Sequence, residues 1–588
     1  MRRFKRLERP LCVRKDARRS RPSFRIEMPG GEAIILAVLF VYVVAFSAWP
    51  LGRLLIEALG AGEAGEPLGL LRESWQGRAA QRAFRNTLST SLASVAISAV
   101  LGIAFALAVS LVKVRGRTLA TFLILSPLLI PSQIMALAWI ELIGSSSPVL
   151  GPLGLSPAPG TPNPLYSPGG IALLMGIEHM PLVFLAVRAA LAFLPNDLVE
   201  AARISGARPG RILWRVLLPL TLPAAIAGSI LAVAAAIGNF GVPALLGIPG
   251  RYTMLTTLIY QRLNGFGPAI IGQVGTLALM LIMMAAAALL LRALFLKKLA
   301  VPVERAGVPL RPLEIGRGRY VVEALLWAGL VVLSILPLAA LIGSSLTPAL
   351  GVRLSFETAT LSNYVSTLVN GPAIHRAFVN SFALSLGAAL VCAVVAVPFA
   401  YLALIRRSRL AQALDWLADA PFVVPGTVLA LAMILVFLPP LPVIGVSIYG
   451  TAAILFVAYL ARFLPLALRP VGGALPSIEP AVDEAGRVAG ARIGRRLVRI
   501  VAPLVAPAAI AGGVLVFMTG FNELTVSALL WSSGVETVGV MIFALQYEGN
   551  SPAAAAVSTA SVAFILALAA LVDRLGRNLP PGTLPWRL

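Results

Sequence analysis

The sequence is poor in the residues that most often carry chemistry. Its 588 residues include 2 histidines and 2 cysteines, and charged residues make up only 12%. Cys12 falls in a basic N-terminal stretch and Cys392 in an apolar run, so a disulfide framework is not plausible. His179 and His375 are the two histidines, and no cluster of Cys, His and carboxylate residues has the spacing of metal ligands. We therefore expect no metal site in this chain.

Lysine is also scarce, which bears on phosphate binding. A loop of the form Gly-x-x-x-x-Gly-Lys-Ser/Thr needs a lysine that directly follows a glycine. None of the five lysines, at positions 5, 15, 113, 297 and 298, follows a glycine. The chain is therefore expected to bind no cofactor and to be no enzyme, and any ATP that it depends on must be hydrolysed by a partner.

Apolar residues, by contrast, make up 58% of the sequence. A transmembrane helix needs roughly 20 mainly apolar residues, and its backbone groups are paired within the segment. The apolar runs do not alternate as barrel strands would. We predict an all-α integral membrane protein with twelve spans, at 33–56, 87–112, 118–143, 169–194, 223–247, 271–295, 321–345, 379–405, 412–438, 449–469, 507–530 and 553–572.

The net charge of +23 suggests a nucleic-acid partner, but the positions of the charges contradict this. Eleven Lys/Arg residues lie in the first 30, and seven lie from Arg292 to Arg319, whereas 145–168, 439–449 and 532–552 carry none. This alternation predicts a multi-pass membrane protein with a cytoplasmic N-terminus. The predicted outer loop 57–82, with its arginines, is the exception. The basic tail also suits anionic membrane lipid.

Two stretches of the chain are near-copies of each other. Residues 200–228 and 484–512 are identical at 18 of 29 positions without a gap. Pro127 and Pro131 match Pro421 and Pro425 in the same order, as do Ala83-Phe84-x-Asn86 and Ala377-Phe378-x-Asn380. With six spans in each half, both halves start on the same side, so the repeats are parallel. The predicted division is a basic tail 1–30, a first half 31–300, a linker 301–319, a second half 320–575 and a tail 576–588.

The repeated segments, which we call the first repeat loop (195–219) and the second repeat loop (479–503), have their own local pattern. In the first, Asn196 or Asp197 is suited to cap a short helix, and Glu200 lies where the helix dipole favours an anion. Gly206 allows the chain to turn. A basic helix then follows, which we expect Pro219 to end before the next span begins.

This spacing resembles the cytoplasmic loop of permease subunits in type I, binding-protein-dependent ABC importers: Glu-Ala-Ala, three residues, Gly, nine residues, Ile-x-Leu-Pro. The second loop departs from it at Gly486 and Ala502. The resemblance implies the type I permease fold, two copies of an ABC ATPase bound to the two loops, and an extracytoplasmic solute-binding protein. The residues that it assigns to ATPase coupling are Glu200, Ala201, Ala202, Gly206 and Pro219, and Glu484, Ala485, Gly490 and Pro503.

Among fused two-half permeases, the chain looks most like the ferric-iron group. The stretches 238–247 and 523–530 favour it. The resemblance implies ferric iron as the solute, held by the binding protein, with thiamine, phosphonate or polyamine as alternatives within the same class.

Ionisable residues within spans are candidates for function, although packing explains most such residues. Those in the predicted spans are Glu141, Glu178, His179, Arg188, Asp415, Asp419, Arg462 and Glu523. Glu523 and its counterpart in the first half, Asn239, are our candidates for the pathway. Other classes remain open: an ATP-independent secondary transporter, which can also pair six-helix halves, or a membrane-bound enzyme or sensor. The former would have no reason to repeat a docking loop.

Overall fold

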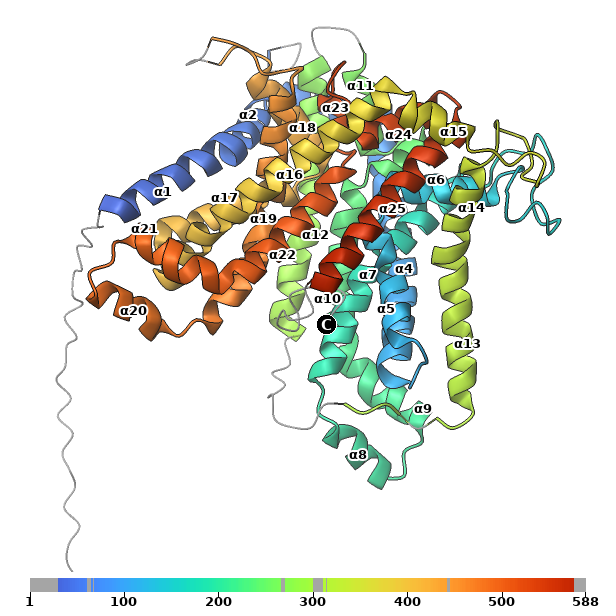
Figure 1. Ribbon diagram of the computed structural model, residues 1–588, viewed down its shortest axis with the longest axis horizontal. Coiled ribbons are helices and arrows are strands. Elements are labelled where there is room, and N and C mark those ends of the chain that lie inside the picture. Colours follow the sequence, from blue (N-terminus) through green and yellow to red (C-terminus); the bar gives the residue numbers. More distant parts are fainter. Residues whose placement is uncertain are drawn as a thin grey trace, which may run out of the picture.

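The structure is a computed structural model that describes residues 30–60, 65–66, 68–265, 270–299, 310–313, 315–441 and 445–575. The predicted tails, apart from Gly30, and most of the linker 301–319 lie outside these residues. The regular elements of the described part are helices, arranged as two bundles that come together at the end with α11 (Leu255–Leu263), α18 (Gly426–Phe437) and α24 (Val538–Tyr547) and diverge toward α8 (Asp197–Ile204) and α20 (Pro480–Val488) (Figure 1).

The first half contains α1 (Gly30–Val43), η1 (Val44–Ala48), α2 (Trp49–Ala58), α3 (Gly69–Gln76), α4 (Arg78–Leu111), α5 (Arg117–Leu129), α6 (Ser132–Ile143), α7 (Pro168–Phe193), α8 (Asp197–Ile204), α9 (Pro209–Ile212), η2 (Leu213–Leu217), α10 (Leu218–Gly238), η3 (Pro243–Gly247), α11 (Leu255–Leu263) and α12 (Ile270–Leu299). The second half contains α13 (Gly318–Leu330), η4 (Val331–Ile335), α14 (Leu336–Ser345), α15 (Ser362–Tyr364), η5 (Val365–Val369), α16 (Pro372–Ala400), η6 (Tyr401–Ile405), α17 (Arg409–Val423), α18 (Gly426–Phe437), α19 (Ala452–Ala474), η7 (Leu475–Ser477), α20 (Pro480–Val488), α21 (Ile493–Arg496), η8 (Leu497–Val501), α22 (Ala502–Phe521), α23 (Ser527–Leu530), α24 (Val538–Tyr547) and α25 (Ser551–Leu575).

The described residues hold ten helices long and apolar enough to cross a membrane, and two further bent pairs that count as spans if each pair is taken together. Each of the twelve predicted windows overlaps one of these. The windows 118–143 and 412–438 coincide with the two bent pairs, in which α5/α6 bend by 107° and α17/α18 by 109°. Pro131 and Pro425 stand at the two breaks. Proline removes a backbone donor and forces the preceding residue into extended backbone, which ends the helix there.

Several other prolines are accommodated without ending a helix. Pro50, Pro219, Pro337 and Pro503 each lie two residues after a π-helical turn, in η1, η2, η4 and η8 respectively. The wider turn relieves the clash of the proline ring with the preceding turn. The basic helix of the first repeat loop was therefore not ended by Pro219 as expected. It continues into the span, as one helical segment from Pro209 to Gly238, and the second copy does the same from Ile493 to Phe521.

Glycines let the long helices approach closely. A Cβ atom on Gly102 of α4 would lie 2.7 Å from Val183 Cβ of α7, and one on Gly176 of α7 would lie 2.7 Å from Ile97 Cβ of α4. Ser98 Oγ donates to the Gly176 carbonyl across the same contact, at 2.8 Å. Because lipid supplies no hydrophobic drive between helices, such close backbone packing holds membrane bundles together.

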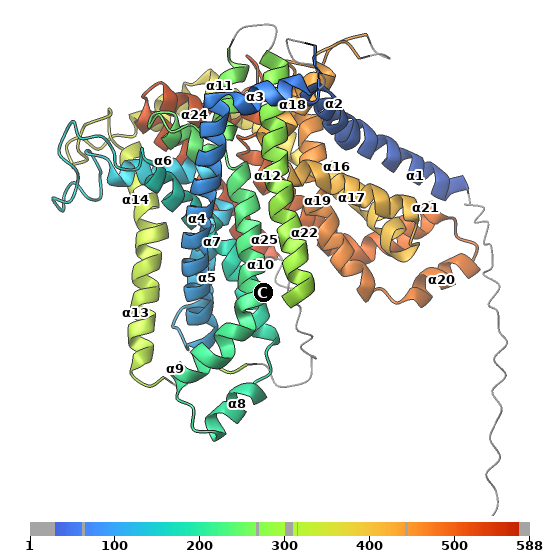
Figure 2. The same ribbon diagram turned by 180° about the vertical axis from the view of Figure 1, so that it is seen from behind.

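The two halves exchange their first helices. α1 packs on α17 and α16 of the second half, whereas α13 packs on α4 and α5 of the first. Glu323 of α13 accepts a hydrogen bond from the Arg115 backbone N–H at 3.0 Å. Figures 1 and 2 show α8 and α20 at the same end of the molecule, at separate corners, with α11, α18 and α24 at the opposite end. We call the end that carries α8 and α20 the repeat-loop end.

Candidate functional site: the repeat loops and the intramembrane polar residues

Both repeat loops make the same turn. Gly206 has φ +77° and Gly490 φ +73°, in the left-handed region that favours glycine. The Gly206 N–H donates to the Arg203 carbonyl at 2.8 Å, and the next N–H donates to the Ala202 carbonyl at 3.0 Å, which closes the end of α8. The end of α20 has the same two bonds around Gly490. A larger side chain at either glycine would strain the turn that separates the short helix from the span.

Asn196 stands at the N-cap position of α8, but its side chain does not cap the helix. Its Nδ2 donates to Glu200 Oε1, and its Oδ1 accepts from the Arg311 backbone N–H at 3.2 Å. Asn196 therefore joins the first repeat loop to the linker between the halves, which the sequence did not predict.

Each short helix exposes apolar side chains at equivalent positions. Ile204 of α8 is 89% exposed and Val488 of α20 is 91% exposed. Leu198 and Val482, six residues earlier in each helix, are 41% and 40% exposed. Glu200 and Glu484 are exposed on the same helices. Each short helix thus carries two exposed apolar side chains and an exposed carboxylate at positions that the repeat conserves between its two copies. These positions could have been found from the sequence, because the apolar residues Leu198 and Ile204 recur as the apolar residues Val482 and Val488 at an offset of 284.

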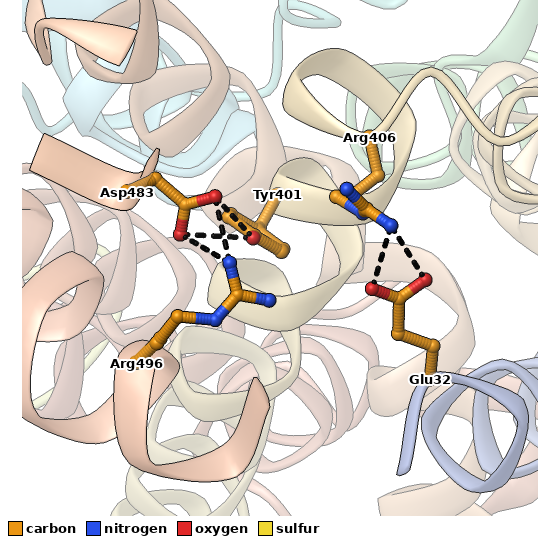
Figure 3. A network of polar contacts seen from close by, with 5 residues as sticks. All are labelled: Glu32, Tyr401, Arg406, Asp483 and Arg496. Carbon is orange, nitrogen blue, oxygen red and sulfur yellow. Dashed lines mark hydrogen bonds and ion pairs between the residues drawn. The ribbon is translucent and has the colours of Figure 1, made fainter. Parts of the chain in front are cut away.

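The inner faces of the two loops differ. In the first, Val199 of α8 and Ile212 of α9 are buried in one apolar cluster. In the second, the equivalent residues are Asp483 and Arg496, which form a buried ion pair at 2.8 Å. Tyr401 of η6 donates to the same carboxylate at 3.0 Å (Figure 3).

Packing beside this ion pair leaves little room for an alanine at position 486 of the second loop. A Cβ atom on Gly486 would lie 2.9 Å from Ile500 Cδ1 and 3.3 Å from Arg496 Cδ. The Ile500 side chain and the stem of Arg496 together occupy the space that a methyl group would need. In the first loop the equivalent residues are the smaller Ile212 and Val216, and Ala202 fits.

Asn239 and Glu523, our candidates for the pathway, follow the ends of α10 and α22 and share a structural role. The Asn239 Oδ1 accepts from the Val242 N–H at 3.2 Å. The Glu523 Oε1 accepts from the Val526 N–H at 2.8 Å, and its Oε2 accepts from Ser527 N at 3.0 Å and Ser527 Oγ at 2.9 Å. Each side chain therefore holds the backbone turn that follows its helix, and the Glu523 carboxylate uses both oxygens for this purpose.

A charged side chain lies beside each of these turns. The two charged residues occupy equivalent positions in the two halves but carry opposite charges. Glu178 of α7 accepts from Asn239 Nδ2 at 2.8 Å. Its counterpart at the offset of 284 is Arg462 of α19, whose Nη1 lies 3.5 Å from the Val424 carbonyl. A Cβ atom on Gly426 would lie 2.9 Å from Arg462 Nη1 and 2.7 Å from Thr525, which places Arg462 beside the Glu523 turn.

Most of the other ionisable residues in the predicted spans have structural partners. Glu141 accepts from Ser344 Oγ of α14 at 2.6 Å, across the halves. Asp415 and Asp419 both form ion pairs with Arg469. Within the described ranges no three His, Cys, Asp or Glu side chains gather as a metal site would require.

The halves also meet through polar and aromatic contacts near these turns. Gln133 Nε2 of α6 donates to the Asn522 carbonyl at 2.9 Å. Phe543 of α24 lies 6.2 Å from Phe240 and 5.9 Å from Tyr260 between ring centroids, so one ring of the second half packs against two of the first. The helices α24 and α11, which carry Phe543 and Tyr260, lie towards the end opposite the repeat loops (Figure 1).

Comparison with known proteins identifies this architecture. A family model described as the binding-protein-dependent transport system inner membrane component matches residues 98–296 and 393–584, one match in each half. This chain belongs to that family. The permease is thus a multi-pass inner-membrane component of a binding-protein-dependent transport system, built from two copies of the family unit.

Several relatives align with the permease. It is 28% identical over 412 residues to the probable ABC transporter permease protein y4fN of Sinorhizobium fredii, which covers 68% of this chain and 70% of that protein. It is 24% identical over 467 residues to the putative ferric transport system permease protein FbpB 1 of Haemophilus influenzae, covering 78% and 72%. It is also 28% identical over 254 residues to the putative 2-aminoethylphosphonate transport system permease protein PhnU of Salmonella typhimurium, covering 43% and 85%.

The role of Glu523 can be tested by comparing two substitutions. We expect Glu523→Gln to lower the free energy of unfolding by about 1–3 kcal/mol, because its amide group would face one of the three donors that the carboxylate now satisfies. Glu523→Asn, the residue that the first half uses at this position, should cost less. Thermal unfolding in detergent measures the difference, and transport per folded molecule should stay near wild type in both variants. Loss of transport in a normally folded Glu523→Asn permease would instead assign the carboxylate to the pathway.

Proposed function

We propose that this permease forms the translocation pathway of an ATP-driven importer and that two copies of an ABC ATPase bind its repeat loops from the cytoplasm. The carrying observation is the pair of short helices α8 and α20, which lie at the same end of the molecule and expose equivalent apolar side chains, Ile204 and Val488. A secondary transporter would have no use for such a pair. An extracytoplasmic binding protein would deliver the solute at the opposite end.

The polar residues of the interior fit an importer in which the binding protein supplies the affinity for the solute and the permease supplies the pathway. Glu523 and Asn239 are occupied by the backbone turns that they hold. A pathway with few free polar groups binds a solute weakly, so affinity resides in the binding protein. ATP binding by the two ATPases would then draw the repeat loops together and open the opposite end, and hydrolysis would reset the permease.

We further propose ferric iron as the solute. One relative long enough to align with both halves supports this, because FbpB 1 is named for ferric transport and covers 78% of this chain. The relative named for 2-aminoethylphosphonate aligns over only 43% of the chain. Thiamine, phosphonates and polyamines are the alternatives in the same class.

Uptake of radiolabelled ferric iron by cells with and without this chain tests the solute, with labelled thiamine and 2-aminoethylphosphonate measured in parallel. Loss of iron uptake alone supports the proposal. Unchanged iron uptake in cells without another iron importer, together with loss of one of the other labels, would replace iron by that solute. The ATP-driven mechanism would not be affected by this result.

A further inference from the structure

The second repeat loop is joined to both halves of the permease by a chain of polar contacts that begins at its short helix. Asp483 lies on α20, next to Glu484, and is 8% exposed. Its carboxylate accepts from Arg496 Nη1 at 2.9 and 2.8 Å, which ties α20 to α21. It also accepts from Tyr401 at 3.1 and 3.0 Å, which ties α20 to the end of the long α16–η6 helix.

A second ion pair lies at the other end of the same π-helical turn. Arg406, directly after η6, pairs with Glu32 of α1 at 2.9 Å, and its backbone N–H donates to the Tyr401 carbonyl at 3.1 Å. Figure 3 shows Tyr401 between the Asp483–Arg496 pair and the Arg406–Glu32 pair. Since α1 belongs to the first half, the contacts run from the short helix α20 through α16 to the other half.

The first repeat loop has no equivalent chain among the residues that the structure describes. The counterparts of Asp483, Arg496 and Tyr401 are Val199, Ile212 and Leu107. Those three belong to, or pack on, one apolar cluster. At these three positions the first loop is therefore held by apolar packing and the second by directed charge–charge and hydrogen-bond contacts.

On the basis of the proposed function, we propose that Asp483, Arg496 and Tyr401 are positioning residues for ATPase coupling at the second repeat loop. Asp483 faces inward one residue before Glu484, so its contacts fix the orientation in which α20 presents its exposed face. Removing one partner leaves a buried charge unpaired, which reorients α20 rather than merely weakening it.

The test uses the complete transporter, permease with its ATPase, in proteoliposomes with the binding protein. Asp483→Asn, Arg496→Gln and Tyr401→Phe each remove part of the network. The quantity measured is solute transported per ATP hydrolysed, together with the KM for the loaded binding protein. We expect the transport ratio to fall on the order of fivefold or more, while the KM and the amount of co-purified ATPase stay at the wild-type values.

A matched control removes an exposed charge from the same loop: Arg495→Gln beside Arg496. This change should leave the ratio unaltered. The double variant D483V/R496I places the first loop's own residues in the second loop, and it should restore most of the coupling that either single variant loses, since it leaves no unpaired charge.

Two results would overturn this inference. One is a wild-type transport ratio in all three single variants. The other is a loss of coupling that D483V/R496I does not restore although that variant folds and binds the ATPase, because the residues would then act by some means other than positioning. Failure of the proposed function is distinguishable from both, since the unmodified permease would then show no ATP-dependent transport at all.

Discussion

Replacing Ile204 and Val488 together by aspartate is expected to abolish the binding of the ATPase and, with it, transport. The two side chains are 89% and 91% exposed, so the change costs the permease itself little. In the assembled transporter we expect each to be buried in the ATPase surface. Burying a valine or isoleucine side chain is worth about 1.5–3 kcal/mol, and a buried unpaired carboxylate adds a desolvation cost. Two such changes act on two separate contacts.

Co-purification of the ATPase with tagged permease measures the effect, with thermal unfolding of the permease alone as the control for folding. Phe356, fully exposed in the loop before α15, offers a matched control, since Phe356→Asp makes the same kind of change away from both repeat loops. It should leave co-purification unchanged. Normal ATPase recovery with the double aspartate variant would exclude α8 and α20 as the binding surface.

A related change at Glu200 and Glu484 separates binding from coupling. Both carboxylates are exposed on the short helices, so Glu→Lys at either position reverses a surface charge without disturbing the turn at Gly206 or Gly490. We expect ATP hydrolysis to continue and transport to fall, because a like-charge contact misaligns the two surfaces. Transport and ATPase activity in the same vesicles measure this. Normal transport with the ATPase still bound would contradict the assignment of these residues to coupling.

The architecture followed from the sequence because its signals are local. Long apolar runs predict the spans, and the alternation of charge predicts their orientation. The fixed spacing around Gly206 and Gly490 requires a turn that glycine alone adopts easily. The twelve windows and the two repeats were accordingly found. Helix ends were less well placed, because a proline ends a helix in one setting and is absorbed by a π-helical turn in another. Pro131 and Pro219 illustrate the two cases.

The roles of polar residues could not be predicted in the same way. Glu523 was notable as an acid in an apolar run, but its three hydrogen bonds depend on how the chain turns after α22. Asp483 and Arg496 lie only 13 residues apart, yet nothing in that spacing indicates that Tyr401, 82 residues away, completes the network. Comparing the two copies position by position would have helped, because an apolar pair replaced by an opposite-charge pair indicates a contact.

Opening the aromatic contact between the halves is the second change with a large expected effect. Phe543 packs against Phe240 and Tyr260 at the end opposite the repeat loops, and Phe240 is 1% exposed. If the halves separate at that end during each cycle, this contact stabilises the closed form selectively. Replacing a buried phenylalanine by alanine lowers stability by about 3–5 kcal/mol. Any part of this loss that affects the closed form and not the open form shifts the population towards the open form.

Phe543→Ala is therefore expected to raise ATP hydrolysis severalfold in the absence of the binding protein, because the permease no longer needs that partner to open. Phe517→Ala is the control: Phe517 stacks on Phe521 at 5.8 Å between ring centroids, and this contact lies wholly within the second half. It should lower stability to a similar extent and leave the dependence on the binding protein intact. Equal basal hydrolysis in the two variants would mean that the loss of an aromatic ring acts through stability alone, and that the Phe240–Tyr260–Phe543 contact does not close the pathway.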